Sequence, residues 1–215
     1  MSPTKAVIFD MDGVIVDSEP HHERAFRIVF DELGYGQTHG VHFPDYIGRS
    51  DNTVWHDFIA KHQPPHSLEE MAALKQRRVL DLMRAAQPIF DGLPELVEKL
   101  AVRFKLAVAS GSQHPVIEEV LAMKGLRQFF SALVSFTDVK HGKPAPDIFL
   151  HAADLLGVAP AECWVIEDSK PGIAAGLAAG MSVVAIANTH PAAELRSATH
   201  VARTYEEIER LLLPG

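Results

Sequence analysis

Cysteine, long hydrophobic runs and excess positive charge are all scarce in this sequence, and each scarcity excludes a class of protein. The single cysteine, Cys163, rules out an internal disulfide. It stands in the apolar run 163–166 without a flanking histidine or other base, which favours a buried side chain over a nucleophile. The apolar run before Asp10 has only four residues, 6–9, too few for the core of a signal peptide, and no segment approaches the length of a membrane span. We therefore expect a cytoplasmic protein with no membrane partner.

The scarcity of positive charge also excludes a nucleic-acid-binding protein. Lysine and arginine number 20 against 28 aspartates and glutamates, for a net charge of −8. Such a chain has no basic field to attract nucleic acid, and any phosphate group must be bound by a few local residues. The hydrophobic fraction of 47% and charged fraction of 22% are those of a globular protein, and 215 residues suit one main domain with a modest insertion.

Short apolar runs alternate with helical patterns through most of the chain. Runs of this kind are typical of strands buried on both faces of a parallel sheet. They occur at 6–9, 106–109, 132–134, 164–166 and 183–186. The helical stretches between and after them are 93–101, 115–124, 146–156, 171–179 and 205–213. The alternation predicts an α/β fold: a doubly wound, Rossmann-like parallel sheet.

The segment 18–86 departs from this alternation, because it has helical patterns and no buried strand. Its predicted helices are 19–33, 53–60 and 68–83, with the prolines at 64 and 65 as a break. We interpret 18–86 as a small α-helical cap domain inserted into a core domain formed by 1–17 and 87–215.

Polar residues stand where the predicted strands end, which is where parallel sheets bind ligands. Asp10 and Asp12 follow the first strand, and Gly13 allows the chain to turn there. Ser110-Gly111-Ser112 follows the second and offers hydroxyl and N–H groups that suit phosphate oxygens. Each motif by itself also fits an ordinary turn or helix start, so their shared position at successive strand ends carries the argument.

Two further motifs complete this set. Lys143 supplies a cation next to Pro144, and Glu167-Asp168 ends a later strand just before a helix that Ser169 can cap. The full pattern resembles the haloacid dehalogenase superfamily, in its helical-cap branch that includes β-phosphoglucomutase and many sugar-phosphate phosphatases. The segments that carry the resemblance are 9–19 (FDMDGVIVDSE), 110–112 (SGS), 143–149 (KPAPDIF) and 167–169 (EDS).

The resemblance implies a role for each of these residues. Asp10 would be the nucleophile, and Asp12 the acid that protonates the leaving oxygen and then activates water. Asp10, the Asp12 backbone carbonyl and Asp168 would hold a metal ion, with Glu167 supporting them. The resemblance also implies that the transferring phosphoryl group would be held by Ser110, Gly111, Ser112 and Lys143.

Charge alone argues that such a site needs a divalent cation. At ~4 Å and an effective dielectric of ~20, each pair of like charges costs about 4 kcal/mol. Four carboxylates and a phosphate cannot be balanced by one lysine. Oxygen ligands beside phosphate favour Mg²⁺ over zinc or copper, so Mg²⁺ is the expected cofactor.

The cap offers two candidates for substrate contact. His22 stands twelve residues after Asp10, where β-phosphoglucomutases carry a histidine, although a solvated histidine in a first helical turn fits the sequence equally well. Arg49, in Gly48-Arg49-Ser50, can form paired hydrogen bonds to an anion or a hydroxyl-rich group, or lie in a surface turn. Lys75 and its neighbours Arg77 and Arg78 are interpreted as a solvated helix face.

The expected function is a Mg²⁺-dependent phosphatase of a small phosphorylated metabolite, with a sugar phosphate as the favoured substrate and a monomer as the expected state. The alternative is a β-phosphoglucomutase-type phosphomutase. It is disfavoured because register from Gly48 places Asp51 where those mutases have a basic residue. The core positions just after the serine motif, which are basic or amide-bearing in those mutases, are Gln113 and His114 here, so the chain is short of cations for a bisphosphate. A haloacid dehalogenase would have no use for Asp12 as an acid, and a non-catalytic binding protein would not need the complete set of motifs.

Overall fold

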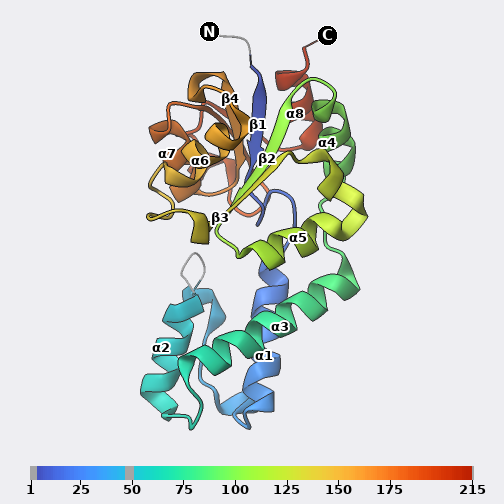
Figure 1. The fold of residues 1–215 in the computed structure, drawn as a ribbon. Helices are drawn as coiled ribbons and strands as arrows, with labels where there is room; N and C mark the ends of the chain where they lie inside the picture. Colours follow the sequence, from blue (N-terminus) through green and yellow to red (C-terminus); the bar gives the residue numbers. More distant parts are fainter. Residues whose placement is uncertain (1–3, 47–50, 215) are drawn as a thin grey trace. The chain divides into compact units, whose positions relative to one another are not determined.

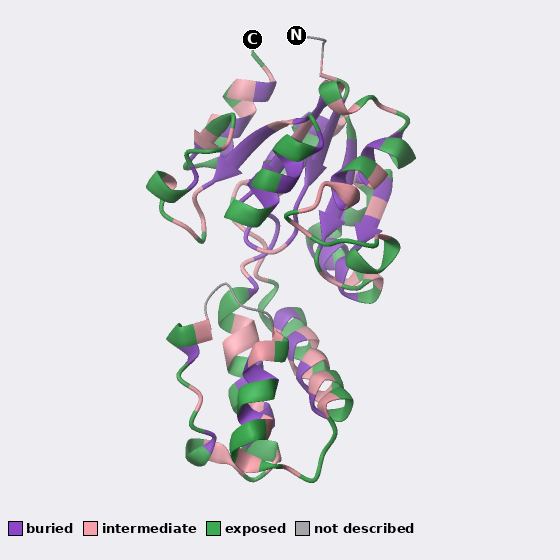
Figure 2. Cartoon of the chain, turned by 90° about the vertical axis from the view of Figure 1, so that its left-hand side faces the viewer, coloured by how far each residue is buried: buried purple, intermediate pink, exposed green. Residues whose placement is uncertain are grey.

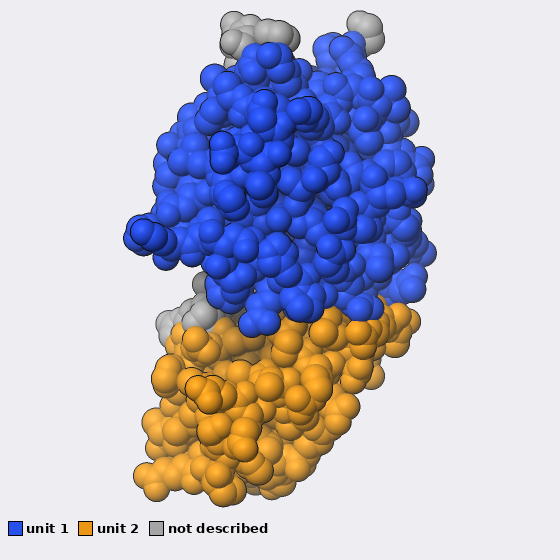
Figure 3. All heavy atoms as spheres, in the orientation of Figure 1, with its two compact units in different colours: residues 1–17, 87–215 blue, residues 18–86 orange. Residues whose placement is uncertain are grey.

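The computed structural model describes residues 4–46 and 51–214 and divides the chain into two compact units. Unit 1 comprises residues 1–17 and 87–215, and unit 2 comprises 18–86 (Figure 3). Among the described residues, no helix is both long and apolar enough to cross a membrane.

Unit 1 is built on one sheet of parallel strands in the order β3-β2-β1-β4-β5-β6 (Figure 1). The strands are β1 (Ala6–Phe9), β2 (Lys105–Ser110), β3 (Ala132–Ser135), β4 (Cys163–Glu167), β5 (Ser182–Ile186) and β6 (His200–Ala202). The chain starts in the middle of the sheet at β1, adds β2 and β3 on one side, and then β4 to β6 on the other. The order therefore reverses beside β1, and in such sheets ligands bind at the strand ends next to this reversal.

Helices cover both faces of the sheet and bury its strands, which Figure 2 shows in purple. The helices of unit 1 are α4 (Leu93–Ala101), α5 (His114–Ala122), α6 (Asp147–Leu156), α7 (Lys170–Ala178) and α8 (Tyr205–Leu212). α6 packs on β1, β2 and β3 and α7 on β4 and β5, whereas α5 packs on β3 and α4 on β2 and α8. All four residues of β1 are fully buried, as expected of an apolar strand covered on both sides.

The predicted doubly wound α/β fold is confirmed, with one strand missed. β6 has only three residues, and its first, His200, is exposed. A segment this short at the edge of the sheet has no continuous apolar run to mark it. The expectation that Cys163 is buried is also confirmed: its side chain is 1% exposed, and burial raises the pKa of the thiol to about 11.

Among its described residues, unit 2 contains helices and no strand. It contains α1 (Glu19–Glu32), α2 (Asp51–His62) and α3 (Leu68–Ala86), with short 3-10 turns at Gly36–Thr38 and Phe43–Tyr46. α1 packs along α3. Aromatic side chains form its core: the Phe26 and Trp55 rings are 4.8 Å apart and those of Phe30 and Phe58 4.7 Å apart. The unit thus has a hydrophobic core of its own.

Candidate active site

The carboxyl ends of β1 and β4 bring the first predicted residues together. Asp10 directly follows β1 and is 6% exposed, and Asp168 directly follows β4 and is 7% exposed. Gly13, with a φ of +76°, turns the chain beside them. A Cβ atom built at Gly13 would lie 2.0 Å from Oδ2 of Asp168, so only glycine lets the two loops approach this closely.

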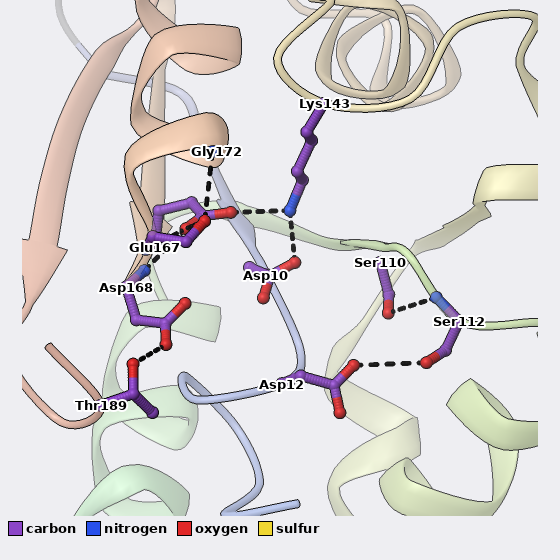
Figure 4. A network of polar contacts seen from close by, with 10 residues as sticks. Asp10, Asp12, Ser110, Ser112, Lys143, Glu167, Asp168, Gly172 and Thr189 are labelled. Carbon is purple, nitrogen blue, oxygen red and sulfur yellow. Dashed lines mark hydrogen bonds and ion pairs between the residues drawn. The ribbon is translucent and has the colours of Figure 1, made fainter. Parts of the chain in front are cut away.

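Lys143 joins the two strand ends through two carboxylates. Its ammonium donates one short hydrogen bond to Oδ1 of Asp10 and another, of 2.7 Å, to Oε1 of Glu167 (Figure 4). Burial opposes the charge on Lys143, but the carboxylates of Asp10 and Glu167 outweigh burial and raise the pKa of the ammonium above its ordinary value. Lys143 is therefore a fixed positive charge beside Asp10.

Glu167 is held by hydrogen bonds to both of its carboxylate oxygens. While Oε1 accepts from Lys143, Oε2 accepts from the backbone N–H of Asp168 at 2.8 Å and from the N–H and hydroxyl of Ser169 at 2.7 and 2.8 Å. Gly172 leaves room for this carboxylate, because a Cβ there would lie 1.6 Å from Oε1. Glu167 thus orients Lys143 and the start of α7, which the Ser169 side chain caps.

Three carboxylates in this cluster could hold a metal ion. One oxygen each of Asp10, Glu167 and Asp168 lies within 4.8 Å of the others, and all three side chains are buried. Oxygen-only ligands suit a hard divalent cation. Because donors already occupy both oxygens of Glu167, Asp10 and Asp168 are the better placed ligands.

The pKa values of these carboxyl groups indicate that one lysine does not balance the negative charge of the cluster. With the protein groups alone, burial and the neighbouring Glu167 and Asp168 carboxylates raise the pKa of Asp10 well above its usual value, although Lys143 acts against them. Burial and the Glu167 carboxylate raise the pKa of Asp168 to about 7. The pKa of Glu167 is instead lowered, because Lys143 and the Ser169 donors outweigh its burial.

Asp12 lies next to the serine motif at the end of β2. The Ser112 hydroxyl donates to Oδ2 of Asp12 at 3.2 Å, and the Ser112 N–H donates to the Ser110 hydroxyl at 3.0 Å. Ser110 is fully buried. A Cβ at Gly111 would meet no atom within 4 Å, so packing alone does not require glycine at that position. The structure therefore gathers the predicted residues of all four motifs in unit 1 (Figure 4).

Sequence reasoning missed a fourth strand end. The Thr189 hydroxyl donates a short hydrogen bond to Oδ2 of Asp168, and Asn188 donates to the carbonyl of Gly13 at 2.9 Å. Asn188 and Thr189 stand two and three residues after the end of β5, whereas Asp10 directly follows β1. Two polar residues directly after an apolar run were the available signal, but Asn and Thr are also common in turns.

In unit 2 the structure corrects the interpretation of Lys75. Its side chain is 1% exposed, so it does not belong to a solvated face. The ammonium lies 2.5 Å from Nδ1 of His22 and 2.5 Å from Oδ2 of Asp51, and 4.9 Å from the centre of the Phe26 ring. The prediction was wrong because it weighed only the charge of Lys75, whereas Asp51 on a neighbouring helix provides the counter-charge that permits burial.

The other candidates of this unit have different outcomes. His22 lies against Lys75 and is half-buried. Arg49 lies outside the described residues. His39 stacks on Phe30 at 4.6 Å and accepts a hydrogen bond from the N–H of Val41.

Comparison with known proteins agrees with the geometry of unit 1. Residues 4–180 match the model of the haloacid dehalogenase-like hydrolases. Fructose-1-phosphate phosphatase YqaB of Escherichia coli (strain K12) is 37% identical over 184 residues, which cover 83% of this chain and 94% of that protein. Hexitol phosphatase B of the same strain is 35% identical over 185 residues, covering 84% and 82%. The crystal structure of β-phosphoglucomutase from Clostridium difficile is 25% identical, covers 95% of this chain and 93% of its own, and has a TM-score of 0.76.

The parallel α/β sheet and the acidic residues at its strand ends define a hydrolase whose site is built around a lysine and carboxylates. The family match covers well over half of the chain. This protein belongs to the haloacid dehalogenase-like hydrolase family.

Proposed function

We propose that this protein is a Mg²⁺-dependent phosphatase of a small phosphorylated metabolite, with sugar phosphates as the substrate class, and that it works through an aspartyl-phosphate on Asp10. The observation that carries the proposal is the position of Asp10 at the end of β1, hydrogen-bonded to Lys143 and clustered with Asp168. Similarity to phosphatases of fructose 1-phosphate and of hexitol phosphates supports the substrate class.

The proposed reaction has two steps. A carboxylate oxygen of Asp10 attacks phosphorus, the bond to the substrate oxygen breaks, and Asp12 gives its proton to that oxygen. In the second step Asp12 takes a proton from a water molecule as the water oxygen attacks the phosphorus of the aspartyl-phosphate. Inorganic phosphate leaves, and Asp10 and Asp12 return to their starting states.

The donors around Asp10 fit the phosphoryl group in this reaction. Lys143 offers a fixed positive charge, and Ser110, Gly111 and Ser112 offer hydroxyl and N–H groups at the neighbouring strand end. Charge-assisted hydrogen bonds of this kind stabilise a transferring phosphoryl group whose oxygens carry negative charge.

The residues present also fit the proposed metal. Asp10, Asp168 and the Asp12 backbone carbonyl would hold Mg²⁺, and Glu167 would orient Lys143 beside it. Bound there, the ion would neutralise the charge that accumulates between the nucleophile and the phosphoryl oxygens. The raised pKa values of Asp10 and Asp168 are consistent with a site built for an additional cation.

Unit 2 is proposed to act as the cap that recognises the non-reacting part of the substrate. His22 and Arg49 are the proposed contact residues, and closure of such a unit would exclude water from Asp12 when it acts as an acid. Lys75 holds His22 in place through the 2.5 Å contact. The cytoplasmic location and the monomeric state stay predictions.

The second candidate function is a phosphomutase, which structural similarity to a β-phosphoglucomutase favours. A mutase must bind a bisphosphate at both ends, and two described side chains that could bind a second phosphate already face a carboxylate. Lys75 pairs with Asp51, and Nε2 of His114 lies 2.7 Å from Oδ2 of Asp138. Hydrolysis therefore remains the better supported function.

A substrate screen tests the proposal. The purified protein is incubated with fructose 1-phosphate, hexitol phosphates, glucose 1-phosphate and other sugar phosphates, with and without Mg²⁺, and free phosphate is measured. Mg²⁺-dependent release from at least one sugar phosphate is expected. Conversion of glucose 1-phosphate to its 6-phosphate isomer without net release would identify a mutase, and no change in any substrate would refute both functions.

A further inference from the structure

The turn that carries Asp12 is buried and closed by its own hydrogen bonds. The N–H of Gly13 donates to the carbonyl of Val16 at 2.9 Å, and the N–H of Ile15 donates to that of Met11 at 2.7 Å. Val14, Ile15 and Val16 are fully buried. A buried turn leaves backbone carbonyls that must find donors elsewhere in the protein.

Two side chains from distant parts of the sequence supply those donors. The Asn188 amide donates to the carbonyl of Gly13 at 2.9 Å and to the Tyr205 hydroxyl, also at 2.9 Å. The Tyr205 hydroxyl in turn donates to the carbonyl of Val14 at 2.6 Å. The two residues form one chain of three hydrogen bonds that ends on two successive carbonyls of the turn.

Tyr205 is a rigid source for this bond. It is the first residue of α8, where Thr204 caps the helix, and it is 6% exposed. Its ring lies 6.4 Å from that of Phe90, whose N–H donates to the carbonyl of Ile15 at 3.3 Å. Burial also raises the pKa of the Tyr205 hydroxyl above its ordinary value, so the group keeps its proton and acts as a donor.

We propose that Tyr205 and Asn188 are positioning residues that fix the turn 11–16 so that Asp12 can transfer a proton to the leaving oxygen. This inference rests on the proposed function. The hydrogen bonds of both residues to the turn run to its backbone carbonyls, so both act through the backbone of the turn. Proton transfer needs hydrogen-bond distance between acid and acceptor, and a displacement of about 1 Å can lower a rate by about 10²-fold.

The leaving group of the substrate distinguishes this role from a general structural one. A sugar phosphate needs a proton on its departing alkoxide, whereas p-nitrophenolate leaves without one. The parameter to compare is kcat/KM, because it reports only the steps up to formation of the phosphoenzyme. Tyr205→Phe keeps the ring and removes the hydroxyl. We expect kcat/KM to fall about tenfold or more on the sugar phosphate and by less than about twofold on p-nitrophenyl phosphate.

Two reference variants frame that result. Asp12→Asn should show the same leaving-group pattern in a stronger form, because it removes the acid itself. Tyr35→Phe removes a tyrosine hydroxyl from the aromatic core of unit 2, while its ring stays packed against Phe58. This variant should leave kcat/KM unchanged on both substrates. Equal losses on both substrates in Tyr205→Phe, or no loss on either, would overturn the proposal.

Hydrogen exchange tests the same inference without any activity. Loss of one neutral hydrogen bond should accelerate amide exchange at Gly13, Ile15 and Val16 about two- to tenfold in Tyr205→Phe, and not in Tyr35→Phe. Unchanged exchange rates would refute the role of Tyr205, whether or not the protein is active. Absence of turnover on every phosphate ester would instead refute the proposed function. Should Tyr205→Phe fail to fold, Asn188→Ala removes the bond to Gly13 and must show the same two effects.

Discussion

Each unit of this protein contains a lysine held between polar side chains, and the two lysines differ in their surroundings. Both ammonium groups lie 4.9 Å from the centre of a phenylalanine ring, Lys143 over Phe149 and Lys75 over Phe26. Lys143 contacts two carboxylates, with that of Asp168 nearby. Lys75 contacts one carboxylate, that of Asp51, and one imidazole.

The difference in charge indicates a difference in what each cluster can bind. Around Lys143 the carboxylates outnumber the lysine, so a further cation is favoured and, with it, a phosphoryl group. Around Lys75 one carboxylate balances one ammonium, so this ion pair offers no excess positive charge to a second phosphate. The comparison supports a substrate with one phosphate at the catalytic end.

The largest expected effect on activity comes from removing the proposed nucleophile, Asp10, from the cluster around Lys143. Asp10→Asn keeps the shape of the side chain but cannot form the phosphoenzyme, so kcat should fall by on the order of 10⁴-fold or more. Rapid-quench detection of phosphoenzyme and steady-state phosphate release measure this. Asp154→Asn, on the exposed side of α6, is the matched control. Wild-type rates in Asp10→Asn would refute covalent catalysis.

Removal of divalent metal tests the charge imbalance around Lys143. After exhaustive EDTA treatment, turnover should fall at least about a hundredfold, because the metal contribution is several kcal/mol and each 1.36 kcal/mol is a factor of ten. Added Mg²⁺ should restore the rate, and Zn²⁺ or Ca²⁺ should bind without supporting turnover. Full activity in EDTA would contradict the proposal.

Arg49→Ala tests whether unit 2 recognises the substrate while unit 1 carries out the chemistry. Loss of a charged hydrogen bond of about 1.5–3 kcal/mol corresponds to about a tenfold to somewhat over a hundredfold loss in kcat/KM on the natural substrate. On p-nitrophenyl phosphate, which has no sugar to recognise, the change should be small. Steady-state kinetics on both substrates provide the test, and equal losses would mean that Arg49 is structural.

The pH dependence of Mg²⁺ binding tests the raised pKa of Asp168 in the cluster around Lys143. Because burial raises the pKa of Asp168 to about 7, protons compete with the metal below that pH. The apparent affinity for Mg²⁺ should weaken by up to about tenfold for each pH unit below 7 and level off above it. Calorimetric titrations between pH 5.5 and 8.5 would also detect proton release on binding. An affinity that stays constant down to pH 5.5 would show that Asp168 is ionised throughout.

The smallest expected effect is on the free energy of unfolding, when the ion pair of Lys75 and Asp51 is broken. Asp51→Asn leaves the ammonium of Lys75 buried without its counter-charge, whereas Lys75→Met leaves a carboxylate that is 45% exposed and still solvated. Asp51→Asn should therefore cost about 1–2 kcal/mol, or about 2–8 °C in Tm, and Lys75→Met less. Thermal unfolding of the two variants at equal ionic strength compares them directly. The reverse order would mean that packing of the lysine stem is more important than its charge.

The sequence alone determined every strand of the sheet except β6, the approximate helix limits and the family, because these depend on local patterns. β1 and α4 (Leu93–Ala101) have the predicted limits, since continuous apolar runs and helical periodicity are read from neighbouring residues. Several catalytic candidates were likewise visible, because Asp10, Ser110 and Asp168 stand at the ends of strands and the parallel order brings strand ends together. Lys143 lies instead in the loop between β3 and α6.

Only the tertiary structure decided which polar side chains are buried and what they contact. Lys75 looked solvated until α2 placed Asp51 against it. Thr189, Asn188 and Tyr205 carried no distinctive pattern, because their partners lie far away in the sequence: Tyr205 reaches the carbonyl of Val14 across 191 residues. A hydrogen bond between such distant residues leaves no local periodicity, since it depends on how the fold brings the end of β5 and the start of α8 to the turn after β1.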